Sequence, residues 1–344
     1  MPVSTQNTKI TADIYMPPDL LKELRSAYQE ECRKELVELH ISNFLWNVRI
    51  VQQYPGILKF EHLFPHIPAV IVGVGPSLDK HIPLLSKYRK NYIMVAVDAA
   101  LPILIKHNIY PDFVGMVDPT PKQADNFNNI DTTKFYTVLP PIVHPSVFRK
   151  LDPLHVLLFN VKDPQSPIME QIPYHTGQKG ALPAGVLTSG TCFAFAVIMG
   201  CDPVLFVGHD LSWPTPDKVY AQGVSKQKEN FQKGAKFRSN CLLFPDIYGN
   251  LVLTHNTFLN FWAWMRDFCK DAAVRVINCS EAGILLHEYM KAMPFEVALR
   301  RYASKELVGI KERIDRTYIE SKYPGGMVEK LLYPKWKSKK KGGV

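Results

Sequence analysis

The stretch Pro68-Ala-Val-Ile-Val-Gly-Val-Gly-Pro-Ser-Leu78 carries the strongest fold signal in the chain. Residues 69–72 form an apolar, β-branched run without polar alternation, which is typical of a parallel strand buried on both faces. Gly73 and Gly75 follow and allow backbone to approach a ligand, and Pro76-Ser77 suits the start of a helix, whose N–H groups attract anions. The pattern predicts a phosphate-binding turn, and a plain strand-to-helix turn is the alternative.

The turn departs from two well-known phosphate motifs. Leu78 stands where the dinucleotide fingerprint G-x-G-x-x-G has its third glycine, and no Gly-Lys-Ser/Thr follows, as a P-loop requires. The glycines therefore favour an anion site without specifying its ligand.

Short apolar runs alternate with helical stretches beyond Pro68, which indicates βαβ units. We expect a Rossmann-like, mostly parallel sheet with helices on both faces. The runs at 92–97 and 113–117 stop at Asp98 and Asp118, which places both carboxylates at the edge of the sheet where ligands bind. Each aspartate is equally explained as a loop or cap residue.

Further strands are expected at 135–139 and 155–159. Residues 160–183 contain four prolines and little periodicity, so we interpret them as a long loop that serves as a lid.

A second informative stretch runs from Leu187 to Trp213. Thr188 and Ser189 are expected to cap a helix over 190–199, which begins at Gly190. A buried strand over 204–207 then ends at Gly208-His-Asp210, so hydroxyl groups and a carboxylate reach the same sheet edge. Ordinary capping is the alternative for the two hydroxyl residues.

Two residues outside these stretches are candidates for chemistry. Tyr220 lies in a polar loop over 214–238, and His255 lies at a strand-to-helix junction, where a helix N-terminus favours the neutral imidazole that acts as a base. A buried histidine that donates to backbone is the alternative for His255. Phe44 and Trp46 close an N-terminal helical segment that we expect to pack on the core and to carry no chemistry, and a charged amphipathic helix is expected over 295–323.

Composition describes a globular protein of 344 residues, 46% of them hydrophobic, enough to bury a full core. We expect a leader and helical segment over 1–60, the Rossmann-like nucleotide-binding domain over 61–290, and a helix with a basic tail over 291–344. Six lysines between residues 330 and 344 supply most of the net charge of +9. Such a tail predicts at most a weak contact with a membrane surface, and nucleic acid is not expected as a partner.

The six cysteines are scattered without C-x-x-C spacing, which indicates thiols in a reducing compartment. The N-terminal residues lack the apolar region of a signal peptide, and no run reaches 18 apolar residues. We therefore expect a cytoplasmic protein.

The sequence resembles the motility-associated-factor (Maf) flagellin glycosyltransferases and the 6-hydroxymethylpterin diphosphokinase MptE-like domain that they contain. The shared segments are 69–79, 109–118, 200–211, 246–250 and 277–283, so the resemblance covers about residues 40 to 290. The landmarks at 73–78, 188–190 and 208–210 are also similar to those of bacterial sialyltransferases that use CMP-sialic acid.

The resemblance implies roles for particular residues. The pocket for CMP would be lined by Gly75, Ser77, Asp98, Thr188, Ser189 and Gly190; Tyr220 would contact the leaving phosphate, and His255 would be the general base. Two departures concern the phosphate contacts: Asp98 replaces an amide, and Ser212-Trp213 replaces an aromatic hydroxyl.

Three functions are compatible with these features. The first is a glycosyltransferase that moves a CMP-activated nonulosonic acid to a protein or glycan hydroxyl and needs no metal. The second is an ATP-dependent 6-hydroxymethyl-dihydropterin diphosphokinase, with Mg²⁺ held by Asp98, Asp118 and Asp210. The third is a non-enzymatic binding module that acts through the Lys tail.

Overall fold

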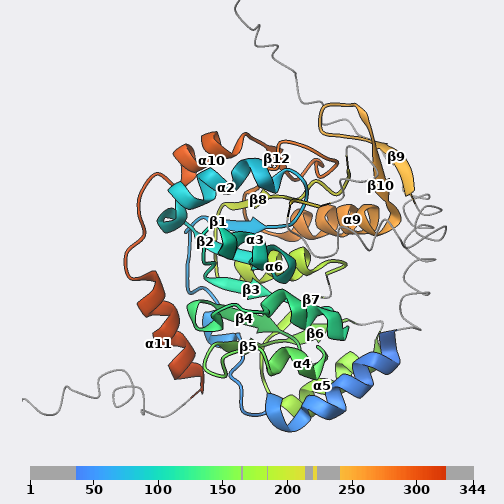
Figure 1. Cartoon of the computed structure of the whole chain (residues 1–344), viewed down its shortest axis with the longest axis vertical. Helices are drawn as coiled ribbons and strands as arrows, with labels where there is room; N and C mark the ends of the chain where they lie inside the picture. Colours follow the sequence, from blue (N-terminus) through green and yellow to red (C-terminus); the bar gives the residue numbers. More distant parts are fainter. Residues whose placement is uncertain (1–35, 164–165, 184, 214–219, 223–240, 323–344) are drawn as a thin grey trace, which may run out of the picture.

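The computed structural model describes residues 36–163, 166–183, 185–213, 220–222 and 241–322. Its centre is an eight-stranded sheet in the order β12-β11-β8-β1-β2-β3-β4-β5, in which every neighbouring pair is parallel (Figure 1). The strands are β1 (Ala69–Val72), β2 (Ile93–Val97), β3 (Phe113–Gly115), β4 (Tyr136–Leu139), β5 (Val156–Leu158), β8 (Val204–Val207), β11 (Val276–Asn278) and β12 (Lys291–Ala292). The expected Rossmann-like α/β fold is confirmed.

Strand β1 lies at the centre of the sheet and explains why its sequence is uniformly apolar. Its residue Ala69 pairs with Ile93 of β2 on one side and with Val204 of β8 on the other. All four of its side chains are fully buried, since helices cover both faces of the sheet. Burial on two faces removes the polar alternation that a one-sided strand would show.

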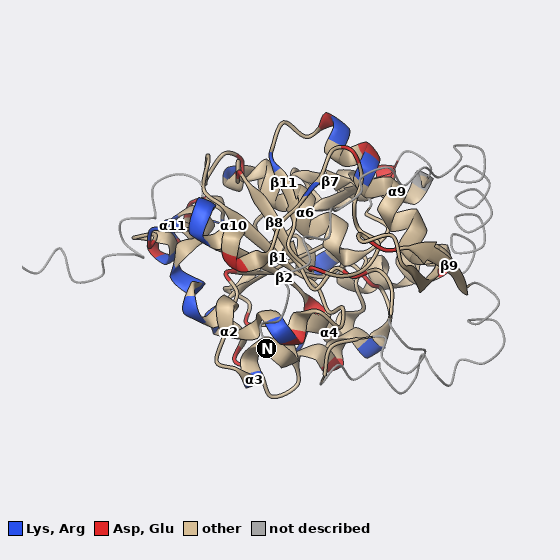
Figure 2. Ribbon diagram, turned by 90° about the horizontal axis from the view of Figure 1, so that it is seen from above, with Lys and Arg blue, Asp and Glu red and all other residues tan. Residues whose placement is uncertain are grey.

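The helices flank this sheet on both sides. Helices α2 (Leu78–Lys87) and α3 (Leu101–Lys106) lie on one side of β1 and β2, and α6 (Thr188–Ile198) lies on the other (Figure 2). Among the described residues, the other helices are the N-terminal helix (36–51), α4 (Pro145–Phe148), α5 (Pro167–Thr176), α9 (Asn256–Asp271), α10 (Phe295–Tyr302) and α11 (Ile310–Lys322). The 3₁₀ turns of this part of the chain are η1 (Leu58–Phe60), η2 (Arg89–Asn91), η3 (Asp98–Ala100), η4 (Pro121–Phe127) and η5 (Thr132–Lys134).

Residues 160–183 are not the long loop that the prolines predicted. They form β6 (Asn160–Lys162), then α5, then β7 (Ala181–Pro183), which pairs with β6 in parallel. The proline that opens α5 costs no hydrogen bond, because the first N–H groups of a helix have no partner within it. The proline at the helix start was therefore misinterpreted as a loop residue, and the predicted loop is wrong for the described part of this segment.

The N-terminal helix is fastened to the sheet by two asparagines one turn apart. Asn43 Nδ2 donates to the carbonyl oxygens of Pro119 and Ile142, at 2.8 and 2.9 Å. Asn47 Nδ2 donates to those of Pro141 and Val143, at 2.9 and 2.7 Å. These bonds tie the helix to the loops that follow β3 and β4.

The expected packing of the end of this helix is only partly right. Phe44 is buried against Met169 and Ile172 of α5, but Leu45 and Trp46 are 66% and 77% exposed. The expected helical segment before residue 36 and the leader lie outside the described residues.

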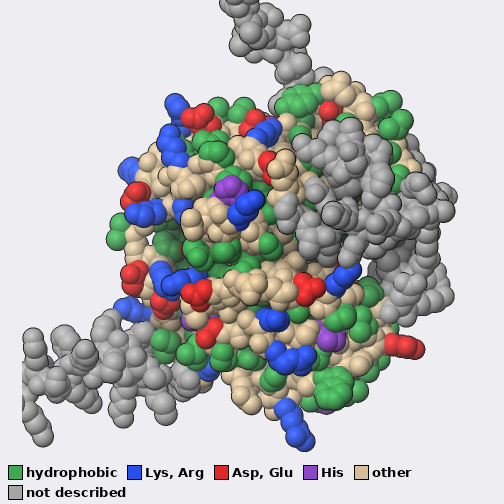
Figure 3. Space-filling model, viewed as in Figure 1, with side chains coloured by type: hydrophobic (Ala, Val, Ile, Leu, Met, Phe, Trp, Pro, Cys, Tyr) green, Lys and Arg blue, Asp and Glu red, His purple; other side chains and the backbone are tan. Residues whose placement is uncertain are grey.

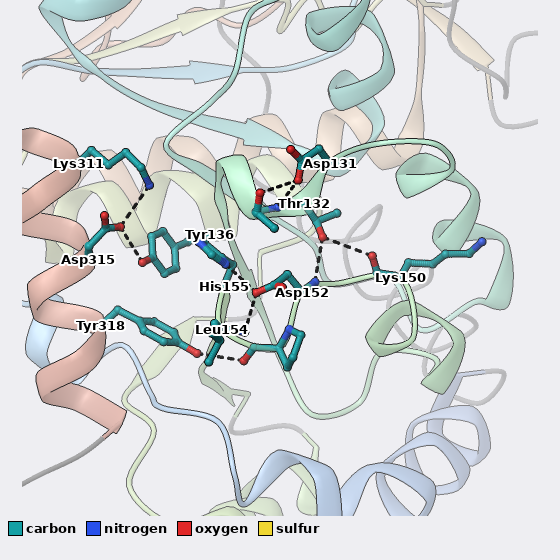
Figure 4. A network of polar contacts seen from close by, with 12 residues as sticks. Asp131, Thr132, Tyr136, Lys150, Asp152, Leu154, His155, Lys311, Asp315 and Tyr318 are labelled. Atoms are coloured by element: carbon teal, nitrogen blue, oxygen red, sulfur yellow. Dashed lines mark hydrogen bonds and ion pairs between the residues drawn. The ribbon is translucent and has the colours of Figure 1, made fainter. Parts of the chain in front are cut away.

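The C-terminal segment forms two helices rather than the single amphipathic helix expected over 295–323. Helix α10 ends at Tyr302, and α11 begins at Ile310 after Gly309, whose φ is +73°. Tyr136 Oη donates to Asp315 Oδ1 at 2.8 Å and so ties α11 to β4 (Figure 4). The last residue of the domain expected over 61–290 directly precedes β12, which extends the same sheet.

The surface is chemically mixed. Acidic and basic side chains are interspersed on the face drawn in Figure 3. Within the described ranges, no helix is both long and apolar enough to span a membrane. The Lys tail lies outside those ranges.

Candidate functional site

The candidate site lies at the carboxyl edge of the sheet, at the point where the strand order reverses. From β1 the strands proceed through β2 to β5 on one side, whereas β8, β11 and β12 lie on the other side. Such a switch point leaves a crevice beyond the strand ends, where ligands bind in open α/β sheets. Here it is flanked by the turn after β1 and by Gly208-His-Asp210 after β8.

The turn after β1 is filled by a carboxylate of the protein itself. Asp210 Oδ2 accepts hydrogen bonds from Ser77 Oγ at 2.7 Å and from the Ser77 N–H at 3.2 Å. The Gly75 N–H donates to the Gly208 carbonyl at 2.7 Å. Burial raises the pKa of Asp210, although the bonds from Ser77 oppose that shift. The N–H and the hydroxyl group of Ser77 therefore bind Asp210 and not an external anion.

The two glycines of this turn are needed for the same contact. A Cβ on Gly73 would lie 2.5 Å from the Gly208 carbonyl oxygen, and one on Gly75 would collide with Asp210 Oδ2. The sequence predicted close approach of a ligand, whereas the structure shows close approach of β1 and β8. Pro76 precedes Ser77, and α2 begins one residue later.

The aspartates that follow β2 and β3 each have partners within the protein. Asn126 Nδ2 donates to Asp98 Oδ2 at 2.8 Å. Asp118 Oδ1 accepts from the Thr120 N–H at 2.8 Å and from Thr120 Oγ1 at 2.7 Å, and its Oδ2 accepts from Gln123. The loop interpretation therefore describes Asp118 well, because it accepts from Thr120 two residues later, and Thr120 is the N-cap of η4.

The start of α6 differs from the expectation. The N-cap is Leu187, so Thr188 and Ser189 are the first two helical residues, and neither is its cap. Gly190 packs closely, because a Cβ there would lie 2.9 Å from a ring carbon of Trp264 and 3.1 Å from the Gly185 Cα. Gly190 is thus required by helix packing.

Two cavities open at this edge, and some of the predicted residues line them. The predicted residues that line neither cavity are Pro76, Ser77, Asp98, Gly190, Asp210 and His255. A small one of about 70 Å³ is lined by the predicted residues Gly73, Gly75, Ser189, Gly208 and Tyr220. A larger one of about 450 Å³ is lined by Asp118 and Thr188. Leu187 lines both. Neither lining contains Lys or Arg within the part of the chain that the structure describes.

The two predicted catalytic residues occupy different positions. Tyr220 lines the small cavity, and the next residue, Ala221, donates its N–H to the Val74 carbonyl at 2.9 Å. His255 is the N-cap of α9: its Nδ1 accepts from the Thr257 N–H at 3.1 Å. It lines neither cavity, whereas Thr257 lines the larger one.

Two histidines of the site were not singled out from the sequence. His209 lines the small cavity, and its Nδ1 donates to the Val207 carbonyl at 2.9 Å. Its Nε2 has no partner among the described residues, and burial lowers its pKa to about 4. His209 lies within the Gly208-His-Asp210 motif at the end of β8. Its position in that motif could therefore have indicated a site residue from the sequence alone.

His40 is the second missed residue and lines the larger cavity from the N-terminal helix. Burial lowers its pKa, while the charges of Asp118 and Asp163 act in the opposite direction. No local pattern in the sequence marks His40 as a residue that lines a cavity.

Comparison with known proteins places the chain in a family. Residues 42–216, just over half of the chain, match the model of the 6-hydroxymethylpterin diphosphokinase MptE-like family, and the chain belongs to that family. The resemblance expected from the sequence is confirmed.

A solved structure shares the fold over most of the chain. The structure of the Maf glycosyltransferase from Magnetospirillum magneticum AMB-1 superposes with a TM-score of 0.56 at 17% identity. The match covers 87% of this chain and 44% of that one, so this chain spans less than half of that protein. An uncharacterized protein of Treponema pallidum (strain Nichols) is 33% identical over 82 residues, which are 24% of this chain and 38% of that protein.

Proposed function

We propose that this protein is a glycosyltransferase that uses a CMP-activated nonulosonic acid, of the sialic, pseudaminic or legionaminic type, and transfers it to a protein or glycan hydroxyl. The observation that carries the proposal is the larger cavity beside the switch point. Its volume of about 450 Å³ suits a ligand of sugar or nucleoside size. The fold shared with a Maf glycosyltransferase, which extends beyond the family-model match, supports the same class.

The polar groups of the larger cavity favour a hydroxyl-rich ligand over a polyphosphate. Thr120, Thr188 and Thr191 bring hydroxyl groups, and Asp118 and Asp163 bring carboxylates. Carboxylates accept hydrogen bonds from sugar hydroxyls but repel phosphates. A CMP-sugar carries a single bridging phosphate, so it needs less neutralisation by cations than a triphosphate does.

The smaller cavity suits the leaving group in this proposal. Ser189 and Tyr220 bring hydroxyl donors there. Donors placed where charge develops on the leaving phosphate stabilise the transition state. The phosphate would therefore lie between the two cavities, near Leu187, which lines both.

The second candidate is the 6-hydroxymethyl-dihydropterin diphosphokinase, which the family model favours by name. Its Mg²⁺ would need carboxylates that converge. Asp98, Asp118 and Asp210 each accept hydrogen bonds from neighbouring side chains. Within the described ranges, no three His, Cys, Asp or Glu side chains form a group that could hold a metal ion. These three aspartates therefore do not fit a shared Mg²⁺ site.

Calorimetric binding of CMP and of ATP, each with and without Mg²⁺, tests the proposal. We expect CMP to bind without metal and Thr188→Val to weaken that binding, because Thr188 lines the larger cavity. Thr133→Val is the matched control, since Thr133 is exposed and precedes β4 at the opposite edge of the sheet. ATP binding that depends on Mg²⁺ and is lost in Asp118→Asn, without CMP binding, would favour the diphosphokinase.

A further inference from the structure

The N-terminal helix is a built part of the larger cavity. Its residues Leu36 and His40 line that cavity opposite segments that follow β3 and β6. Asn43, one turn beyond His40, is 2% exposed and bonded to two backbone carbonyls, which fixes the rotation of the helix. His40 is therefore held toward the cavity by side chains that do not contact the ligand space.

The surroundings of His40 suit a group that gains a proton during a reaction. Burial disfavours the charged imidazolium and lowers the pKa, so the ring is neutral at neutral pH and has a free lone pair. Asp118, after β3, and Asp163, after β6, line the same cavity as His40. The charges of both carboxylates favour the imidazolium once it forms.

The other two histidines near the edge are less suited to this task. The Nδ1 lone pair of His255 accepts the Thr257 N–H, so the neutral ring carries its proton on Nε2. If His255 acted as a base through Nδ1, it would lose the hydrogen bond from the Thr257 N–H that caps α9. His209 has a free Nε2, but a pKa of about 4 makes it a weak base at neutral pH.

We propose that His40, and not His255, accepts the proton of the acceptor hydroxyl, which makes the N-terminal helix part of the catalytic site. This inference rests on the proposed glycosyltransferase function. The acceptor O–H bond breaks, its electron pair forms the new bond to the anomeric carbon, and the proton moves to a ring nitrogen of His40. The bond from the anomeric carbon to the phosphate oxygen breaks, and its electron pair leaves with CMP.

The test compares His40→Gln and His255→Gln with the control His107→Gln, which replaces an exposed histidine at the end of α3. CMP binding is measured by calorimetry, and CMP release from CMP-N-acetylneuraminic acid is followed against pH. We expect His40→Gln to weaken CMP binding by no more than a few-fold, because Gln keeps a hydrogen-bonding group at this position of the cavity. We expect the same variant to lose turnover by about 100-fold or more and to lose the acidic limb of the pH profile. Added imidazole should restore part of the turnover of His40→Gly.

A second variant tests the role of the carboxylates that line this cavity. Asp163→Asn removes a charge that raises the pKa of His40, so the acidic limb should move to lower pH. NMR titration of the His40 ring gives the same pKa without any turnover. We expect its ring signals to respond when CMP and N-acetylneuraminic acid are added together.

Three results would overturn the proposal for His40. They are unchanged turnover in His40→Gln, an acidic limb that disappears only in His255→Gln, and a His40 ring that titrates in the same way with and without CMP and N-acetylneuraminic acid. Failure of the wild-type protein to bind CMP is a different result, because it contradicts the proposed function itself.

Discussion

Ser77 and Asp210, 133 residues apart in the sequence, are joined by a 2.7 Å hydrogen bond from Ser77 Oγ to Asp210 Oδ2 across the switch point. Asp210 is buried, and its carboxylate stands where a turn of this composition would bind an anion. The glycine turn after β1 therefore holds β1 and β8 together through this contact, and the two cavities lie beside it.

Replacing Asp210 should show how much its contact with Ser77 contributes to the unfolding free energy. Asp210→Ala leaves the Ser77 N–H and hydroxyl without their acceptor, which should cost about 1–3 kcal/mol of unfolding free energy. Asp210→Asn keeps an acceptor oxygen and should cost less. Chemical denaturation of both variants measures this, and equal losses in the two would contradict the assigned contact.

The burial of Asp210 also predicts that the unfolding free energy depends on pH. Because burial raises the folded-state pKa of Asp210, its contribution is fully present below the unfolded value of 3.8 and is lost as pH rises through the folded pKa. Asn resembles the protonated form, so Asp210→Asn should gain stability relative to the wild type as pH rises above the unfolded value of 3.8. A difference that does not change with pH would exclude a raised pKa.

Glu281 should govern part of the acid stability. Its Oε1 accepts from His81 Nε2 at 3.2 Å and from the Phe295 N–H at 3.0 Å, which joins α2 to the start of α10. The bond from His81 is the largest cause that lowers the pKa of Glu281, which falls to about 2. This stability is present above the unfolded value of 4.5 and is lost as pH falls toward 2. Glu281→Gln should flatten this acid limb in thermal unfolding, and Glu306→Gln, at an exposed position, should not.

Helix α11 should loosen when its polar contact with β4 is removed. Tyr136 donates to Asp315, and its ring lies 5.0 Å from that of Tyr318, whose hydroxyl donates to the Pro153 carbonyl (Figure 4). Tyr136→Phe keeps the ring and removes the bond, so unfolding free energy should fall by about 1 kcal/mol. Lys311→Ala removes only a surface ion pair to Asp315 and should have little effect. The proposed docking is wrong if the two variants lose equal stability.

Asn47 should control the N-terminal helix as a unit. Its side chain is fully buried and bonded to two carbonyl oxygens, so Asn47→Ala leaves both unpaired at a cost of about 1–3 kcal/mol. Hydrogen exchange of residues 36–51 should accelerate before that of the central sheet. Gln52→Ala, which removes an exposed bond to the His175 carbonyl, is the matched control. Exchange that rises equally throughout the protein would show that the helix does not open separately.

The sequence was most informative where a segment is buried on both faces. Strands β1 and β8 have the bounds that their apolar runs predicted, 69–72 and 204–207, because continuous burial leaves a continuous pattern. Gly200 likewise ends α6 with a φ of +82°, as expected of a glycine at a helix end. Local chemistry decides these features, so local sequence was sufficient.

Features that depend on distant partners were not accessible in the same way. Nothing around Gly75 shows that Asp210 will occupy its turn, since that requires β8 to lie beside β1. The inner face of the N-terminal helix is likewise set by carbonyls 76 to 99 residues away. The place of His40 in the lining of the larger cavity could not be read from the sequence for that reason.

The position of β1 between β2 and β8 has a consequence during protein synthesis. A nascent chain can pair β1 with β2 soon after both leave the ribosome, but the other edge of β1 stays open until residue 207 has been made. An unpaired apolar strand is a template for wrong association with other chains. Because β8 is synthesised long after β1, we expect chaperones to bind the incomplete chain. Truncations that stop before residue 204 should be recovered as aggregates.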